Sequence, residues 1–280
     1  MRRAVWGTVL ALLCCVPARS ANAAELTQKT AEAFDRYVQA TEARRDEELR
    51  GGVFFWVDSQ PEPQRASLYA QLRQGHILME QVEARDAGSI QVPGGLVHHW
   101  VALCFIPGAT LNRTLAVLQD YDNHQNIYKP DILRSKVLSA EDGHFKVYLR
   151  LHRKTVVTAV FNAEFDVRYV PVDAARVYSR SYSTRIAEVE NADRPDEHEK
   201  AVGKDRGFLW RLYSYWRFAE KDGGVYVQLE SIALTRGVPP LIAWLVNPLL
   251  KSIPRDYLSH LMDSTRVAIT QRGAVVARSS

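Results

Sequence analysis

The sequence predicts an α+β fold in which a curved antiparallel sheet of seven strands surrounds one long C-terminal helix. Three observations lead to this prediction. Alternating apolar and polar residues run from residue 132 to residue 235, interrupted by short turns and by the charged run 191–206. Two of the breaks contain Asp142-Gly143 and Asp222-Gly223, pairs that are typical of tight hairpins. The segment 253–270 then repeats apolar residues at helical spacing.

The strands are expected to be antiparallel, because parallel neighbours need much longer connections. A helix at 111–120, with Thr110 as its N-cap, follows the first strand. Alternation in the strand 208–220 places Trp210 and Trp216 on one face and Tyr213 and Tyr215 on the other. The seven predicted strands span residues 98–106, 132–139, 145–153, 156–170, 175–190, 208–220 and 225–235.

Residues 24–95 are predicted to form an N-terminal helical extension to a main domain at 96–270. The extension contains one expected helix at 25–50 and a shorter one at 64–74. A strand-like segment at 76–84 and a linker at 88–95 follow. Residues 271–280 are expected to be a flexible tail.

Residues 1–23 are typical of a cleavable secretory signal. Arg2 and Arg3 precede an apolar run from 4 to 16, and Ala21-Asn22-Ala23 offers small residues for cleavage. The run is shorter than the roughly 20 residues of a spanning helix. A lipoprotein signal at Cys14 or Cys15 lacks the small residue that should precede the cysteine. The sequence therefore predicts a periplasmic or secreted protein.

The charge of the remaining chain excludes a strongly basic protein. The first 23 residues hold three arginines and no acidic residue, so 33 basic and 32 acidic residues remain. Nucleic-acid binding needs clustered positive charge, and no partner of this kind is expected. A single cysteine, Cys104, also remains, so the core has to form without an internal disulfide.

Several segments resemble a known protein family. The family's first strand and the turn after it are similar to Val97-His98-His99-Trp100 and 105–111. Its helix and its loop over the cavity mouth are similar to 118–124 and 127–130. Two strands of its sheet are similar to 178–184 and 209–212. Ile253-Pro254-Arg255 resembles the start of its last helix. The family is the START-like or SRPBCC superfamily, of polyketide cyclase/dehydrase and lipid-transport type, and the likeness is to exported bacterial members with the helix-grip fold.

The resemblance implies an internal apolar cavity for a lipid or another hydrophobic small molecule. It implies no cofactor and no common catalytic motif, since many members only bind ligands, and fold does not decide function. Ten residues are candidates for lining this cavity, from the polar aromatic segment 121–131 and from strands. They are Tyr121, His124, Tyr128, Arg150, His152, Arg180, Tyr182, Trp210, Trp216 and Glu230.

The sequence contains no motif for a nucleophilic, phosphate-binding or metalloprotease site. His98 and His99 are neighbours on a strand, so their side chains should point to opposite faces and not share a metal. No metal site is therefore expected. Serine, histidine and aspartate are present, but nothing in the sequence brings them together as a triad.

The expected function is binding of a hydrophobic small molecule outside the cytoplasm. One version of this hypothesis adds transfer of that molecule. Two alternatives stay open. A cyclase or hydrolase would need a buried acid–base pair, for instance with an inward His152 or Glu230. A cell-envelope interaction module would need an exposed apolar patch on the N-terminal helices. The apolar stretch 238–250 either packs on the sheet rim or contacts a membrane.

Overall fold

The computed structural model describes residues 24–82, 90–154, 158–237 and 255–272. The predicted secretory signal, the apolar stretch 238–250 and residues 273–280 lie outside these ranges. Among the described helices, none combines the length and apolar character that crossing a membrane requires.

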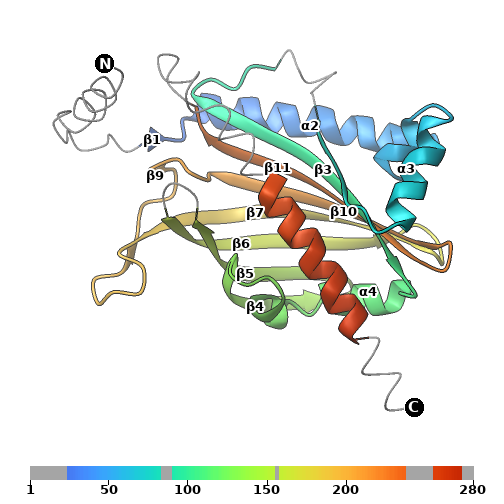
Figure 1. Ribbon diagram of the computed structural model, residues 1–280. Helices are drawn as coiled ribbons and strands as arrows, with labels where there is room; N and C mark the ends of the chain where they lie inside the picture. The colour runs from blue at the N-terminus through green and yellow to red at the C-terminus, as the bar shows by residue number, and fades with distance from the viewer. Residues whose placement is uncertain (1–23, 83–89, 155–157, 238–254, 273–280) are drawn as a thin grey trace, which may run out of the picture.

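All seven predicted strands are present in one antiparallel sheet (Figure 1). The sheet order is β2-β3-β11-β10-β7-β6-β5-β4, so the first long strand pairs with the last. Two short strands, β2 (Leu78–Gln81) and β8 (His198–Glu199), extend it. The long strands are β3 (Gly95–Pro107), β4 (Ile132–Glu141), β5 (His144–Lys154), β6 (Thr158–Pro171), β7 (Arg176–Glu190), β10 (Arg211–Lys221) and β11 (Gly224–Arg236).

The predicted hairpin turns are confirmed. Asp142-Gly143 joins β4 to β5, and Asp222-Gly223 joins β10 to β11. All four residues have positive φ, between 43° and 77°. Two successive positive φ values match the right-handed twist of the flanking strands, which is why Asp-Gly pairs favour this turn.

The C-terminal helix, residues 255–272, crosses one face of the curved sheet, which we call the inner face (Figure 1). Leu258, Leu261, Met262 and Ile269 are buried there against strand residues such as Ala102. This arrangement, an open curved sheet holding one helix, is the helix-grip fold predicted from the sequence.

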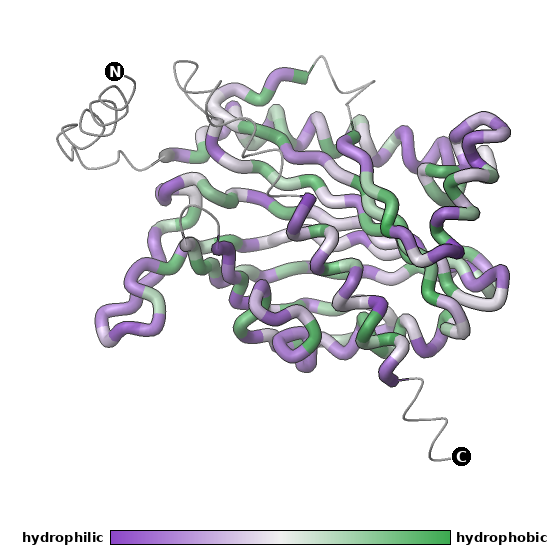
Figure 2. Tube along the Cα trace, in the orientation of Figure 1, coloured by the Kyte–Doolittle hydropathy of each residue, from purple (hydrophilic) through white to green (hydrophobic). Residues whose placement is uncertain are grey.

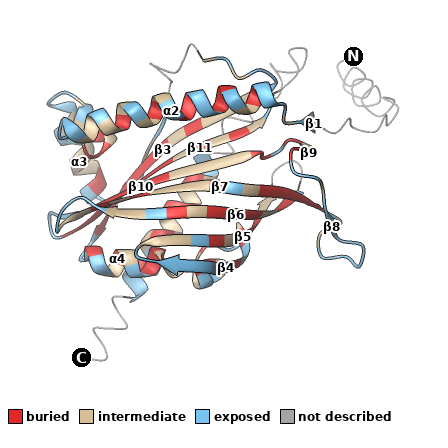
Figure 3. Cartoon of the chain, turned by 180° about the vertical axis from the view of Figure 1, so that it is seen from behind, coloured by how far each residue is buried: buried red, intermediate tan, exposed pale blue. Residues whose placement is uncertain are grey.

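Helix α2 (Gln28–Arg50) covers the opposite, outer face of the same sheet (Figure 3). Thr27 caps it by accepting a hydrogen bond from the Thr30 N–H. Phe34, Tyr37 and Val38 pack on Ile232 and other outer-face residues of β10 and β11. Figure 2 shows the hydropathy of α2 alternating along its length, as expected for a helix with one buried side.

A second cluster on the outer face lies beneath the segment that follows α2. The turn η1 (Trp56–Ser59) and helix α3 (Gln64–Arg73) bury Phe55 and Leu72 against Phe105 and Tyr226. The predicted strand 76–84 is shorter in the structure, where β2 pairs with β3. The N-terminal region therefore contributes both a strand and a cover to the sheet.

Two expectations about local structure were wrong. The predicted loop 121–131 contains two helical turns, η2 (Tyr121–Asn123) and α5 (His124–Ile127), which follow α4 (Leu111–Leu118). Strand β10 begins at Arg211 instead of residue 208, so its alternation does not extend to Trp210. Trp210 packs with Phe34 on the outer face, whereas Trp216 lies on the inner face.

Candidate functional site

The inner face is divided into a covered and an accessible part. Beneath the C-terminal helix, Ala102, Cys104, Val227 and Phe218 are fully buried or nearly so. Burial raises the pKa of the Cys104 thiol to about 12, so this cysteine is protonated and unreactive in the folded chain.

The aromatic segment 121–128 forms part of the covered floor. Tyr121, His124 and Tyr128 are buried and pack edge to face or tilted against one another. The Tyr121 hydroxyl is 3.0 Å from that of Tyr169, and the Tyr128 hydroxyl is 3.0 Å from Thr265 Oγ1 on the C-terminal helix. These contacts fix the segment under the helix, so the structure shows a packed floor.

His124 is neutral within this floor. Burial lowers its pKa to about 4 against the opposing effect of the Leu118 carbonyl. Its Nε2–H donates to that carbonyl at 3.0 Å. His124 therefore contributes a hydrogen bond between α4 and α5 and no charge.

The accessible part of the inner face is lined by side chains that remain half-buried although they lie on the helix side of the sheet. Trp216 stacks on Phe218 with centroids 6.0 Å apart, and Trp100 and Leu212 lie on neighbouring strands. Hydroxyls of serines on β7, β10 and β11 lie between them. This part combines apolar surface with uncharged polar groups, which is the composition of many small-molecule sites.

A buried network of polar and charged residues joins α2 to the outer face. The Tyr37 hydroxyl is 2.7 Å from His99 Nδ1, and His99 Nε2 is 2.5 Å from Glu230 Oε1. Arg45 forms an ion pair with the same carboxylate and stacks 3.6 Å from the centre of the Tyr215 ring. We call Tyr37, Arg45, His99, Tyr215 and Glu230 the α2 network.

The protonation states of the α2 network follow from burial and charge. Burial lowers the pKa of His99, although Glu230 opposes this change. Burial alone would raise the pKa of Glu230, but the Arg45 charge and the His99 hydrogen bond lower it. His99 is thus neutral, with Nε2–H donating to the carboxylate and Nδ1 accepting from Tyr37. The network is a neutral histidine beside one buried ion pair.

Six of the ten candidate residues lie away from the inner face. Glu230 belongs to the α2 network. Arg180 pairs with Asp46 of α2 at 2.6 Å, and the Tyr182 hydroxyl donates to Glu42 of α2 at 2.5 Å. The Trp210 indole N–H donates to Asp205 at 3.1 Å.

The remaining two outer-face candidates lie on β5. Arg150 makes a paired contact with Glu197, at 3.0 and 2.8 Å, from the loop after β7. His152 Nδ1 is 3.3 Å from the Pro130 carbonyl. The structure thus places these six candidates away from the face that the C-terminal helix crosses. Alternation separates the two faces of a strand, but when both faces are covered it does not reveal which one faces the helix.

His98 and His99 point to opposite faces, as predicted. His98 Nε2 is 3.0 Å from Thr235 Oγ1, and burial lowers the His98 pKa to about 4. In the part of the chain that the structure describes, no group of three or more histidine, cysteine or carboxylate residues is placed to hold a metal ion.

The fold brings together one serine, histidine and aspartate that the sequence did not connect. His260 Nδ1 is 2.7 Å from Asp131 Oδ2, and Ser264 Oγ is 3.4 Å from His260 Nε2. Both helix residues lie in the interior of helix 255–272, where backbone N–H groups bond within the helix and cannot stabilise an oxyanion. The arrangement is therefore an anchor between helix and sheet rather than a nucleophilic site.

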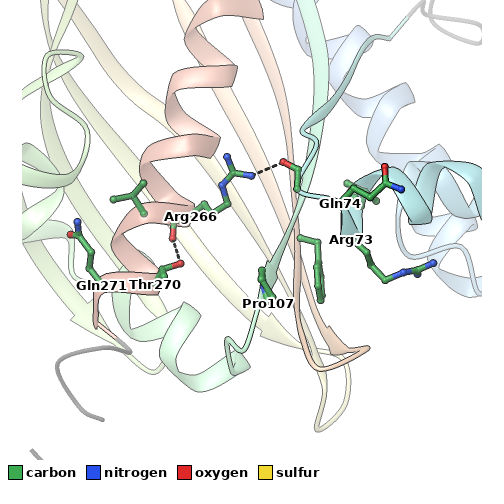
Figure 4. Close-up of a pocket in the computed structure, with 10 residues that line it drawn as sticks. Arg73, Gln74, Pro107, Arg266, Thr270 and Gln271 are labelled. Atoms are coloured by element: carbon green, nitrogen blue, oxygen red, sulfur yellow. Dashed lines mark hydrogen bonds between the residues drawn. The ribbon is translucent and has the colours of Figure 1, made fainter. Parts of the chain in front are cut away.

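A surface cleft of about 490 Å³ lies outside the inner face, between α3, the end of β3 and the C-terminal helix (Figure 4). Arg266 closes one side by donating to the Gly75 carbonyl at 2.7 Å. Arg73 and Val267 on its walls are about half exposed, at 46% and 50%. Such an open site does not enclose an apolar ligand, and sequence reasoning had not identified it.

No protein-family model and no curated protein matches the sequence. The fold is similar to several solved structures. One is a STAR-related lipid transfer protein from Xanthomonas axonopodis, at 19% identity and a TM-score of 0.42, covering 63% of this chain and 96% of that one. Another is the Zhui aromatase/cyclase from a Streptomyces species, at 13% identity and a TM-score of 0.41, covering 63% and 96%.

A third is human STARD10, at 10% identity and a TM-score of 0.44, covering 79% of this chain and 84% of that one. Similarities at this level carry no information about ligand or activity. The order and direction of the strands and the position of the last helix are those of the START-like helix-grip fold, so the resemblance predicted from the sequence is confirmed at the level of the fold.

Proposed function

We propose that this chain binds a hydrophobic small molecule between the accessible part of the inner face and the C-terminal helix. The observation that carries the proposal is the half-buried state of Trp100, Leu212 and Trp216 on the side of the sheet that the helix crosses. Large apolar side chains in a closed core would be fully covered. Covering about 300 Å² of ligand apolar surface there would contribute about 7 kcal/mol before the costs of association.

Binding without catalysis is the version that the structure favours. An enzyme would need an acid–base pair facing the ligand, and the His99–Glu230 pair lies beneath α2 on the other side of the sheet. An interaction module would expose apolar residues on α2 or α3. Within the described ranges the large exposed apolar side chains lie elsewhere, at Leu133, Leu138, Val172, Val202, Phe208 and Val267.

The test is mass spectrometry of small molecules that co-purify with the protein under native conditions, from cells that express the full chain. Ser214→Phe places a bulky ring in the centre of the accessible part and is expected to abolish co-purification. Thr184→Phe is the matched control, because Thr184 is exposed at the register irregularity between β6 and β7 and lies outside the accessible part of the inner face. Equal amounts of the same molecule in wild type and in Ser214→Phe would exclude the inner face as the site.

Export through the sequence 1–23 is part of the proposal, because a carrier of apolar molecules is useful between membranes. The expected mature N-terminus is Ala24 in the periplasmic or secreted fraction, as determined by terminal sequencing. Retention of Met1 in the cytosolic fraction would contradict it. If the protein transfers its ligand and does not only store it, it should move the co-purified molecule from donor to acceptor vesicles.

A further inference from the structure

Three serines form a row across the middle of the inner face. In the strand register Ser181 of β7 lies opposite Ser214 of β10, and Ser214 lies opposite Ser231 of β11. Trp100 of β3 lies opposite Ser231 and ends the row. Residues directly opposite each other share a face, and adjacent strands lie roughly 4.8 Å apart. The row therefore presents three hydroxyls at regular spacing beside an indole ring.

These hydroxyls are available for an external partner. Ser181, Ser214 and Ser231 are half-buried, so solvent reaches them. No side-chain hydrogen bond joins any of the three to another residue of the described chain. The neighbouring Ser183, by contrast, accepts a hydrogen bond from the Leu212 N–H at 3.0 Å.

Ser179 provides an independent sign that a polar partner belongs here. It is two residues before Ser181 on the same face of β7, opposite Trp216 and Tyr169. Its side chain is 1% exposed, and its Oγ has no hydrogen-bond partner. A buried hydroxyl in this state is unfavourable, and such groups in folded proteins normally have a partner. A ligand group placed along the serine row would supply one.

The surrounding strand residues carry no charge. Ser179, Ser181 and Ser183 each belong to a row of paired residues that lie across the sheet on β3, β6, β10 and β11. The paired residues in these three rows are apolar, apart from Ser214, Ser231, Tyr169 and His98. Burial keeps His98 uncharged at neutral pH. Arg180 of β7 and Arg217 of β10, which flank these rows, bond with Asp46 and the Phe54 carbonyl on the outer face. A carboxylate or phosphate placed on these rows would lose water without gaining a cation from the strands.

We infer that the ligand is an uncharged lipid-like molecule whose apolar body packs on Trp100, Leu212 and Trp216 and whose hydroxyl or ester groups bond with the serine row. This inference rests on the proposed function and narrows it to a ligand class. Monoacylglycerols and sterol-like alcohols have this chemistry, whereas fatty acids and phospholipids do not.

The test compares two fluorescent probes with the same acyl chain, a nitrobenzoxadiazole-labelled monoacylglycerol and the correspondingly labelled fatty acid, titrated at pH 7.5 into the purified protein. The uncharged probe is expected to bind at least tenfold more tightly. The variant S181A/S214A/S231A should weaken binding of the uncharged probe at least tenfold and change binding of the fatty acid less than twofold. Thr184→Ala is the matched control, because this exposed threonine of β7 lies outside the serine row, and it should change neither.

The outcomes separate the two levels of the proposal. Equal binding of both probes, or tighter binding of the fatty acid, would overturn the inference about ligand class and leave the proposed function standing. Absence of binding by both probes would overturn both. Unchanged binding of the uncharged probe to the triple variant would remove the serine row from the site, provided that circular dichroism shows the variant is folded.

Discussion

Glu230→Gln should destabilise the protein by isolating a buried positive charge. The side chains of Arg45 and Glu230 are only 5% and 9% exposed, so little water is available to replace the lost carboxylate charge. The Gln amide oxygen can still accept the His99 Nε2–H, so the substitution removes mainly the charge. Breaking one partner of such a pair typically costs about 3–5 kcal/mol. That is a large part of the 5–15 kcal/mol by which most proteins are stable.

Urea unfolding followed by tryptophan fluorescence at pH 7 measures this loss as a lower midpoint with an unchanged m-value. Arg45→Met with Glu230→Gln removes both charges and should recover more than half of the lost stability. Glu25→Gln is the control, because its ion pair with Lys204 is about two-thirds exposed and should contribute under about 1 kcal/mol. A Glu230→Gln loss below about 1 kcal/mol, or a double variant no more stable than the single one, would refute the reasoning.

Three further outcomes are expected. The unfolding free energy should fall from pH 6.5 to pH 4, because burial lowers the pKa of His124 to about 4 and the unfolded chain binds that proton near pH 6.5. The difference corresponds to about 3 kcal/mol for His124, and His98, whose pKa burial also lowers to about 4, adds a fall of similar size. His124→Gln should therefore reduce the fall in the urea midpoint without abolishing it, and a level wild-type profile would contradict this. Cys104 should react with a thiol reagent only after denaturation, because its thiol is buried and has a pKa of about 12. Rapid labelling of Cys104 in the native chain would be inconsistent with the structure. Tyr128→Phe should lower stability by about 1 kcal/mol through loss of the contact with Thr265, seen as a decrease of about 2–4 °C in Tm; an unchanged Tm would mean that this contact does not hold the helix.

The strand order along the chain was predictable because turn chemistry and alternation are local signals. Asp142-Gly143 and Asp222-Gly223 require only two adjacent residues with positive φ, and the structure confirms both turns. Thr110 accepts from the Arg113 N–H as the expected N-cap of α4. The pairing of β3 with β11 joins residues more than 100 positions apart, and no local pattern indicates it.

The site was less predictable because both faces of several strands are covered. Glu230, Tyr182 and Arg180 were candidates for the cavity wall, but the sequence did not show which face of the sheet they lie on. A charged residue within a strand needs either solvent or a buried partner. The partners of these three residues are on α2, more than 130 residues earlier in the chain. The serine row was overlooked for a related reason. Isolated serines in three strands have no pattern until the register aligns them.

The long sequence separation between α2 and its partners has a consequence for the order of folding. The Tyr215 hydroxyl donates to Glu42 across 173 residues, and Arg45 reaches Glu230 on β11. Helix α2 is synthesised before these strands, so it has no surface of this kind to pack on until β10 and β11 have been made. Contacts of this kind slow folding. A nascent chain built this way stays incompletely folded until β10 and β11 have been made.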